Sequence, residues 1–339
     1  MKEIVVVGAG IAGMEASWRL ASLGYKVTLI EKKETIGGHV ANWDRLFPNR
    51  RPASEVIDHL IEKIKNDNIT LMLETNIVNI ERTRDERFFI QFSNNRNITS
   101  DAILFTIGFN LFNARRKEEY GYGIYDNVIT SAELEKMLRE KGDIVNASGE
   151  TPKRVGIVHC VGSRDEKCGN MYCSKVCCVT GVKQAIEIKE LHPDTQVLNF
   201  YMDLRMFSRN FEQLYLEAQK NGVRFVRGRL SESSETKEGA VNIKVEDTLN
   251  SKPLKVTVDM LVLMVGYEPA TDTATLANNI GIDLNRDRFL GIKDEHIAEN
   301  LTNQKGVFVA GACTGPKSIN ETMADARSAV FEIHEFFKD

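Results

Sequence analysis

The sequence predicts an α/β fold made of two Rossmann-like units, of which the second is inserted into the first. Residues 3–30 read as strand, glycine-rich loop, helix and strand in that order. A buried-strand pattern that starts with aspartate and ends in glycine and an aromatic residue occurs twice, at 101–109 and at 259–267. This repetition marks the two points where the chain passes between units. We therefore expect one discontinuous domain over 1–118 and 259–339, and an inserted domain over 119–258.

Length and charge narrow the classes of function. A chain of 339 residues is long enough for about two domains. Its 44 basic residues nearly balance 48 acidic ones, which leaves no electrostatic footprint for nucleic acid or an anionic membrane. No apolar run is long enough for direct membrane insertion, and the first strand begins at once, so we expect a cytoplasmic protein. In that reducing compartment, clustered thiols indicate metal or redox chemistry rather than disulfides.

The glycine-rich loop after the first strand predicts a dinucleotide site. Gly8, Gly10 and Gly13 match the pattern G-x-G-x-x-G directly between a strand and a helix. Such glycines allow a tight turn, close approach of a pyrophosphate to the backbone, and close packing of helix on strand. Glu31 ends the second strand, where a carboxylate accepts hydrogen bonds from an adenosine ribose and disfavours a 2'-phosphate. FAD or NAD is therefore expected in preference to NADP.

A second pair of glycines extends this signature. Gly37 and Gly38 follow Glu31 with the spacing E-x5-G-G, which resembles the FAD-binding signature of flavoproteins with two dinucleotide domains. We therefore expect FAD as a cofactor, and His39, just beyond the pair, is a candidate for the flavin pocket. The residues expected to bind the cofactor are Gly8, Gly10, Ala12, Gly13, Glu31, Lys32, Gly37, Gly38, His39, Gly108, Gly311, Ala312, Ser318 and Ile319.

The C-terminal region is expected to return to the flavin. A short apolar run ends at Gly311, and Ser318 with Glu321 forms a capping-box pattern that predicts a helix from about Ile319. Related flavoproteins usually end this strand in Gly-Asp, whose carboxylate holds the ribityl chain. Here Ala312 follows the glycine. The ribityl contact is therefore expected from backbone groups or from another side chain.

Five of the six cysteines lie between Cys160 and Cys178. They follow a predicted strand, 154–159, and precede a predicted helix, where an α/β fold normally binds its ligand. From spacing alone, four soft thiolates fit an iron–sulfur cluster or a zinc ion. A third alternative is a dithiol of Cys173 and Cys177, one helical turn apart, that exchanges electrons with a flavin.

The same turn argues against a second dinucleotide. A nicotinamide-binding loop needs its own three glycines, and the sequence offers only Gly162. Direct oxidation of NAD(P)H is therefore not expected. The sixth cysteine, Cys313, is expected to be a small buried residue rather than a redox group.

Longer stretches around the cysteines resemble the A-subunit family of heterodisulfide reductase. They read HCVGSRDEKCGNMYCSKVCC, VKQAIEIKELHPDTQV, FYMDLRMF, NGVRFVRGR and GVFVAGACTGPKSINET, and the resemblance covers nearly the whole chain. It implies a thioredoxin or disulfide-reductase-like flavoprotein architecture. It also implies a [4Fe-4S] cluster held by Cys160, Cys173, Cys177 and Cys178.

The resemblance assigns further roles. It leaves Cys168 as a spare thiol, implies that Lys183 approaches N5 of the flavin, and implies a homodimer. The chain has no C-x2-C-x2-C runs of ferredoxin type, which is similar to the short A-subunit of bacterial sulfur-oxidising heterodisulfide reductase-like complexes. In the methanogenic proteins such runs form inserted or appended cluster domains, so we expect none here.

We therefore expect an FAD- and [4Fe-4S]-dependent electron-transfer subunit that works with the B- and C-subunits of a heterodisulfide reductase-like complex and with a lipoate-binding protein. Three alternatives stay open. They are the A-subunit of a quinone-interacting oxidoreductase of sulfate reduction, a stand-alone NAD(P)H-dependent flavin disulfide reductase, and a flavoprotein scaffold whose cofactors are structural.

Overall fold

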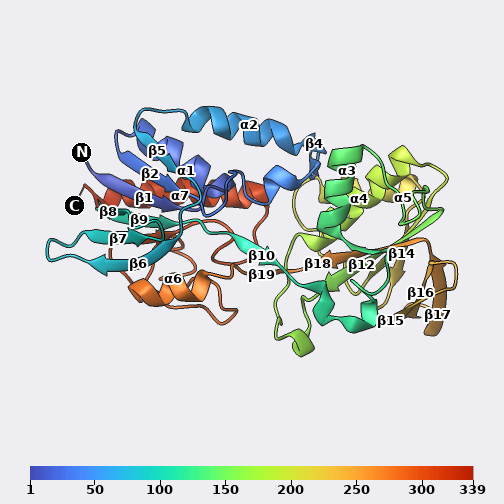
Figure 1. Ribbon diagram of the computed structural model, residues 1–339. Coiled ribbons are helices and arrows are strands. Elements are labelled where there is room, and N and C mark those ends of the chain that lie inside the picture. The colour runs from blue at the N-terminus through green and yellow to red at the C-terminus, as the bar shows by residue number, and fades with distance from the viewer. Residues whose placement is uncertain (339) are drawn as a thin grey trace. The chain divides into compact units, whose positions relative to one another are not determined.

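The chain forms two α/β units, each built around a five-stranded parallel sheet (Figure 1). The computed structural model describes residues 1–338. Unit 1 comprises Met1–Ala41, Ala53–Asn110 and the residues from Glu268 on, and unit 2 comprises Asn42–Pro52 and Leu111–Tyr267. The fold class predicted from the sequence is confirmed.

The units divide differently from the predicted domains in three segments, 42–52, 111–118 and 259–267, which all belong to unit 2. Residues 42–52 belong to unit 2, whereas the sequence pattern predicts them within the first domain. Arg50 holds this segment there, because its guanidinium forms ion pairs at 2.9 Å with Glu190 and with Glu217. The main crossings fall at 110–111 and 267–268.

The sheet of unit 1 carries the glycine-rich loop at its carboxyl edge. Its central strand is buried on both faces, as its β-branched sequence predicts. The helices α1 (Ile11–Ser22), α2 (Ala53–Ile64) and α7 (Ile319–Phe336) pack together. In spatial order the strands are β20 (Val307–Val309), β9 (Ala102–Phe105), β1 (Glu3–Val7), β2 (Lys26–Ile30) and β5 (Ile69–Met72).

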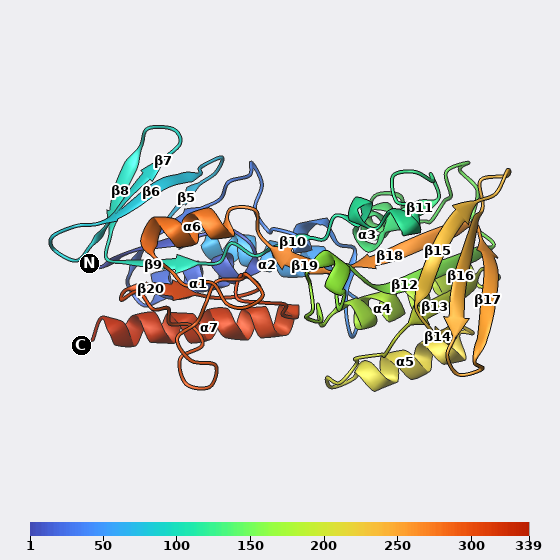
Figure 2. The same ribbon diagram turned by 90° about the horizontal axis from the view of Figure 1, so that it is seen from below.

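An antiparallel sheet and a short helix form the rest of unit 1 (Figure 2). Phe88 and Ile90 of this sheet pack with Val5 of the parallel sheet and with Leu276 in one buried cluster. The elements are β6 (Ile77–Arg82), β7 (Phe88–Phe92), β8 (Asn97–Ser100) and α6 (Thr273–Ile280).

Unit 2 repeats this plan with other elements. Its strands, in spatial order, are β11 (Val128–Thr130), β18 (Met260–Val265), β12 (Arg154–Val161), β13 (Gln196–Tyr201) and β14 (Arg224–Arg227). Its helices are α3 (Ser131–Lys141), α4 (Cys177–Leu191) and α5 (Phe211–Lys220). The hairpin β3 (Arg45–Leu46) and β4 (Arg51–Pro52) belongs to it, and β10 (Phe109–Leu111) pairs with β19 (Tyr267–Pro269) where the chain crosses between units.

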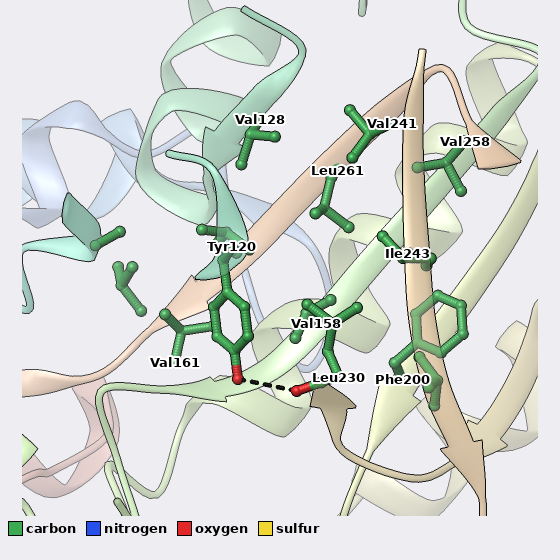
Figure 3. Packing of buried hydrophobic residues seen from close by; sticks show 14 of the residues in the cluster. Tyr120, Val128, Val158, Val161, Phe200, Leu230, Val241, Ile243, Val258 and Leu261 are labelled. Carbon is green, nitrogen blue, oxygen red and sulfur yellow. Dashed lines mark hydrogen bonds between the residues drawn. The ribbon is translucent and has the colours of Figure 1, made fainter. Parts of the chain in front are cut away.

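A second antiparallel sheet packs against the parallel strands of unit 2 (Figure 3). Ile243 and Val241 face Leu261 and Phe200 in this core, and all four are at most 1% exposed. The hydroxyl of Tyr120 donates to the Leu230 carbonyl at 3.4 Å. The sheet consists of β15 (Leu230–Glu235), β16 (Val241–Asp247) and β17 (Lys252–Val258).

The repeated aspartates of the sequence make the same contact in both units. Asp101 accepts a hydrogen bond from the backbone N–H of Glu3 at 2.8 Å, and its own N–H donates to the Glu3 carbonyl. Asp259 does the same with Arg154, also at 2.8 Å. Each aspartate therefore fixes the register of one parallel strand at the first residue of its neighbour.

This contact predicts matched losses of stability. Replacing Asp259 by Ala removes the acceptor of a part-buried N–H, so the free energy of unfolding should fall by about 1–3 kcal/mol, and Asp101→Ala should have the same effect in unit 1. Urea unfolding followed by circular dichroism measures both. Replacing the exposed Lys252 by Ala is the control, with an expected change within about 0.5 kcal/mol. Full stability of both aspartate variants would contradict the assignment.

Candidate functional site

The three glycines after β1 have three different surroundings. A Cβ atom at Gly13 would lie 1.9 Å from the Gly8 carbonyl oxygen, so only glycine lets α1 pack this closely. Gly8 has a φ of +104°, and a Cβ there would meet the Thr106 carbonyl. At Gly10, by contrast, no atom lies within 4 Å of a Cβ position. The space in front of Gly10 is therefore open to a pyrophosphate, at the N-terminus of a 12-residue helix.

The carboxylate of Glu31 lies beside this loop. Its Oε2 accepts a hydrogen bond from the N–H of Ala9 at 2.9 Å, and its Oε1 accepts one from Lys33 at 3.0 Å. The carboxylate is thus buried and oriented by backbone donors, with acceptor capacity left for ribose hydroxyls. An open cavity of about 540 Å³ lies next to it, lined by Lys32, Lys33, Glu34, Thr35, Glu74 and Asn76.

The second glycine pair packs against the first loop. The N–H of Gly37 donates to the Ala9 carbonyl at 2.8 Å, and a Cβ at Gly38 would lie 3.3 Å from the Cα of Gly10. The adjacent His39 stacks on Phe109 with the ring centroids 4.5 Å apart, and its Nε2 lies 2.9 Å from the Phe109 carbonyl. Burial lowers the pKa of His39, which favours a neutral ring.

Other cofactor residues expected from sequence occupy different positions in unit 1. Gly108 follows β9 with a φ of +68° and open space where a Cβ would lie. Lys32 forms an ion pair with Asp272 at 3.0 Å. Ser318 caps α7 and shares the predicted capping box with Glu321. Ile319 therefore begins the helix, as predicted.

The end of β20 lies directly beside the glycine-rich loop. A Cβ at Gly311 would lie 3.0 Å from the Cβ of Ala12. The N–H of Gly311 donates to the Asp325 carboxylate at 2.7 Å, and the same carboxylate forms an ion pair with Lys317. Ala312 is buried. Asp325 and Lys317 thus bring a part-buried ion pair to Gly311. Sequence reasoning missed both residues, because no local pattern marks Asp325 within its helix.

Four of the cysteines of unit 2 gather in one place. Cys160 is the second-last residue of β12, Cys173 lies in the following loop, and Cys177 with Cys178 begins α4. Their thiols are close enough that each raises the pKa of others: Cys160, Cys178 and Cys173 all act on Cys177, and Cys160 and Cys173 act on Cys178. Burial is the largest cause, and it raises the pKa of Cys178 to about 11.

Cys168 lies in a different environment. Burial raises its pKa, the Asp165 carboxylate adds to the rise, and Lys117 opposes it. Asp165 itself is ion-paired with Lys117 and with Arg229 at 2.9 Å each. Cys168 thus packs in the hydrophobic cluster of unit 2, next to charged side chains.

The backbone near the four thiols contains a bulge at Cys160 and donates hydrogen bonds to two of the sulfurs. The pairing of β12 with β18 shifts register between Val158 and Val161, and Cys160 within this bulge has a φ of +60°. A residue other than glycine in the left-handed region is strained, and such strain concentrates at functional sites. Two N–H groups donate to sulfur: Lys175 to Cys173 at 3.3 Å and Arg205 to Cys178 at 3.4 Å.

Among residues 1–338, no three His, Cys, Asp or Glu side chains are gathered closely enough to hold a metal ion. The ligands of one ion must converge on one point, whereas the four thiolates of a [4Fe-4S] cluster each bind a different iron and lie further apart. A [4Fe-4S] cluster at these four thiols therefore stays a prediction.

The turn after β12 lacks a glycine that corresponds to the open Gly10 of unit 1. Gly162 follows β12 with a φ of +72°, and a Cβ there would lie 2.1 Å from the ring of Phe112. Gly162 is thus enclosed as Gly8 is, and the position two residues further on, where unit 1 has Gly10, is occupied by Arg164.

Lys183 lies inside unit 2, one turn beyond Cys178. Its side chain is 1% exposed, and its ammonium contacts Glu135 at 2.5 Å, Glu187 at 3.1 Å and the Arg45 carbonyl at 3.0 Å. Burial lowers the pKa of Lys183, but the two glutamates raise it above its ordinary value. Burial raises the pKa of Glu187 to about 7, an effect that Lys183 opposes. Contact of Lys183 with a flavin stays a prediction.

A family model described as pyridine nucleotide-disulphide oxidoreductase matches residues 2–136 and 178–331. The chain belongs to this family. The fold of this oxidoreductase family implies FAD binding, as predicted. The match is interrupted between 136 and 178, a stretch that contains β12, Cys160, Cys173 and Cys177. This pyridine nucleotide-disulphide oxidoreductase therefore departs from the family model at the thiol-bearing turn.

Curated relatives support the resemblance found in the sequence. The A-subunit of the H2/formate:CoB-CoM heterodisulfide,ferredoxin reductase of Methanococcus maripaludis is 32% identical, over 97% of this chain and 63% of that protein. The iron-sulfur A-subunit of the CoB-CoM heterodisulfide reductase of Methanocaldococcus jannaschii is 30% identical over the same shares. The chain thus spans 63% of the length of these relatives. Both alignments run over 416 residues, so the relatives carry inserted segments within the matched region.

Solved structures confirm the predicted disulfide-reductase-like architecture. Thioredoxin reductase of T. acidophilum superimposes with a TM-score of 0.69 at 17% identity, over the whole of both chains. The enzyme of Lactococcus lactis does so with 0.67 at 17% identity, over 99% of both. None of the helices within residues 1–338 is long and apolar enough to cross a membrane.

The open space at Gly10 predicts a selective loss of flavin. Gly10 has a φ of −74°, which alanine adopts without strain, so Gly10→Ala should keep the stability of the apoprotein within about 0.5 kcal/mol. The added methyl should occupy the approach of the pyrophosphate and weaken FAD binding at least about tenfold, since one close backbone contact is worth more than about 1.4 kcal/mol. Flavin content after gel filtration, beside the thermal unfolding of the apoprotein, measures both. An unchanged flavin content would refute this role of Gly10.

The buried charges of unit 2 predict a pH dependence of stability. The folded-state pKa of Glu187 is raised, so the folded state binds more protons than the unfolded state between about pH 4.5 and pH 7. Stability is therefore lost as the pH rises through this window. Glu187→Gln cannot ionise and should become the more stable protein by about 1–3 kcal/mol at pH 8, with little difference at pH 5.

Urea unfolding at a series of pH values measures this difference. Glu140→Gln, at an exposed position of α3, is the matched control and should follow the wild type at each pH. A constant difference between Glu187→Gln and wild type at all pH values would contradict a raised pKa.

Proposed function

We propose that the chain is the FAD- and [4Fe-4S]-containing electron-transfer subunit of a heterodisulfide reductase-like complex that acts in sulfur-compound oxidation. The observation that carries this proposal is the group of four thiols at the turn where unit 2 would otherwise bind a second dinucleotide. That turn coincides with the interruption of the family match. The cluster, which carries single electrons, would thus stand where a second dinucleotide, which carries electron pairs, would otherwise bind.

Residues of this chain fit both cofactors. Gly10, Gly13 and Glu31 would hold the pyrophosphate and ribose of FAD, and Gly37 would support the loop around them. The sulfurs of the four gathered cysteines would hold the cluster, with the N–H groups of Lys175 and Arg205 directed at two of them. When bound, FAD exchanges two electrons with thiol and disulfide chemistry and the cluster carries one electron at a time. The remaining cofactor residues expected from sequence would line the rest of the FAD site.

Lys183 is proposed as the cation that approaches N5 of the flavin. In unit 2 its charge is held by Glu135 and Glu187. A lysine in such a pair stays protonated over a wide range of pH, and so it would act through its positive charge and its N–H donors rather than as a base.

Partners and location are part of the same proposal. The relatives are named as A-subunits, and one of them carries iron-sulfur in its name, which favours partner subunits of types B and C here. A lipoate-binding protein as the thiol carrier, a homodimer and a cytoplasmic location are proposed on the resemblance alone. The A-subunit of a quinone-interacting oxidoreductase of sulfate reduction is the nearest alternative setting.

One observation favours a second function, a stand-alone NAD(P)H-dependent flavin disulfide reductase. The family is described by pyridine nucleotide and disulfide chemistry, and Cys173 with Cys177 would form the dithiol. Arg164 at the position that corresponds to Gly10 disfavours it, because a nucleotide loop needs glycine there for the pyrophosphate to approach the backbone. Rapid bleaching of the flavin on stopped-flow mixing with NADH would favour this function. An unresponsive flavin would favour the first, and a complex active without redox change of either cofactor would favour a scaffold.

The cluster predicts which cysteines bind iron. Anaerobically purified protein should contain iron and acid-labile sulfide in equal amounts together with FAD. Cys177→Ser should lose most of the iron, because a cluster needs all four ligands, whereas the matched Cys168→Ser should keep it, because Cys168 packs in the hydrophobic cluster of unit 2, apart from the other thiols. Iron and sulfide assays beside the visible spectrum measure both variants. Zinc in place of iron, or equal iron loss in the two variants, would overturn the cluster assignment.

A further inference from the structure

A buried carboxylate from α7 holds the chain at the end of β20. Asp325 is 8% exposed, and its Oδ2 accepts a hydrogen bond from the backbone N–H of Gly311 at 2.7 Å. Its Oδ1 accepts one from the side-chain amide of Asn300 at 2.7 Å, and this amide also donates to the Val309 carbonyl at 3.0 Å. Helix α7 packs against β20 (Figure 2). A carboxylate therefore reaches this strand end from α7, although the residue after Gly311 is alanine.

The same carboxylate holds an ammonium group. Lys317 forms an ion pair with Oδ2 of Asp325, and its Nζ donates to the hydroxyl of Thr314 at 2.8 Å. The Thr314 hydroxyl donates in turn to the Gly311 carbonyl at 3.1 Å. One network thus binds both the N–H and the carbonyl of Gly311, and it fixes the position of Lys317 at the same time.

This network lies at the carboxyl edge of the parallel sheet of unit 1. Strand β20 is parallel to β9, and β9 is parallel to β1, so all three strands end at the edge that carries the glycine-rich loop. A Cβ at Gly311 would lie 3.0 Å from the Cβ of Ala12 in the first turn of α1. Open α/β sheets bind their ligands at this edge. The network therefore adjoins the place where the fold of this family binds FAD.

Both charges of the ion pair act on the end of β20. Cys313 is fully buried, and burial raises its pKa to about 12. The ammonium of Lys317 opposes this rise, whereas the carboxylate of Asp325 adds to it. The two charges therefore act in opposite directions on a group two residues beyond Gly311. Removing one charge leaves the field of the other uncompensated.

Holding Gly311 requires an acceptor rather than a charge. The amide oxygen of an asparagine side chain would accept the same hydrogen bond without the cost of burying a carboxylate. The side chain of Asp325 is only 6% exposed, so this cost is present here. What the charge adds is the position of Lys317, since a lysine ammonium normally extends into water. The carboxylate therefore serves to hold one positive charge beside the sheet edge.

We propose that Asp325 and Lys317 are a positioning pair that sets the reduction potential of the FAD bound by unit 1. On reduction FAD takes up two electrons and one proton, so the ring gains one negative charge. A nearby positive charge favours this reduced form, and a nearby negative charge favours the oxidised form. Lys317 supplies the first and Asp325 the second. The inference rests on the FAD of the proposed function and not on the cluster.

Shifts of opposite sign test this pair in the purified holoprotein. Asp325→Asn keeps an acceptor for the Gly311 N–H and removes the negative charge, so the equilibrium constant for two-electron reduction of the bound FAD should rise at least about tenfold, which is about 30 mV. Lys317→Met removes the positive charge and should lower the constant at least about tenfold. The double variant loses both charges and should return to within about threefold of the wild type. Reduction by xanthine and xanthine oxidase against a reference dye, followed by visible absorption, measures the constants.

The matched control is Glu335→Gln on the same helix. Glu335 pairs with Lys338 at 2.6 Å, and its side chain is 45% exposed, so loss of this charge ten residues beyond Asp325 should change the constant by less than about twofold. The side chain of Lys317 is 23% exposed, so Lys317→Met decides the question even if Asp325→Asn does not fold.

Two results would overturn the positioning pair. An unchanged constant in Lys317→Met would show that its charge does not reach the flavin, and shifts of the same sign in the two single variants would show a structural disturbance in place of an electrostatic effect. Opposite shifts in a protein without iron would refute the proposed cluster and keep the pair. A protein with FAD and iron but without these shifts would refute the pair and keep the proposed function. A wild type that binds no FAD would refute both.

Discussion

The space beyond the carboxyl end of the central strand of each parallel sheet, β1 or β12, determines what that unit can bind. In unit 1 this space is bare backbone, because nothing lies near a Cβ position at Gly10. In unit 2 Arg164 stands at the position that corresponds to Gly10, and thiols line the turn. A dinucleotide needs the first arrangement, since its pyrophosphate must approach backbone N–H groups. The same fold therefore offers one nucleotide loop and one sulfur-lined turn.

Much of this arrangement is predictable because its causes are local in sequence. The glycine-rich loop, the capping box of Ser318 and the position of Glu31 each depend on a few neighbouring residues, and the structure has them where the sequence places them. The repeated aspartates, Asp101 and Asp259, are also predictable as a repeat. Their contact with the neighbouring strand explains why the pattern recurs, since each parallel sheet needs its register fixed once.

The features that sequence reasoning missed depend on residues far apart in the chain. The assignment of residues 42–52 to unit 2 follows from ion pairs of Arg50 with glutamates more than a hundred positions later. The enclosure of Lys183 by Glu135 follows from the packing of α3 and α4 beside the same strands. Lysine on a helix is normally solvent-exposed, so no local signal distinguishes a buried one.

Helix α4 connects the two chemically unusual groups of unit 2. Its first two residues are thiols, and Lys183 with Glu187 lies one to two turns further along the same helix. With Glu135 and Glu187 both ionised, the interior holds two negative charges against one positive charge, which burial disfavours. A proton on Glu187 removes the excess, and the raised pKa of this group is the consequence. Helix α4, which positions two of the sulfurs, is thus held in place by the buried group of Lys183, Glu135 and Glu187, whose net charge changes near neutral pH. Protonation of Glu187 therefore affects the stability of the helix that begins with Cys177 and Cys178.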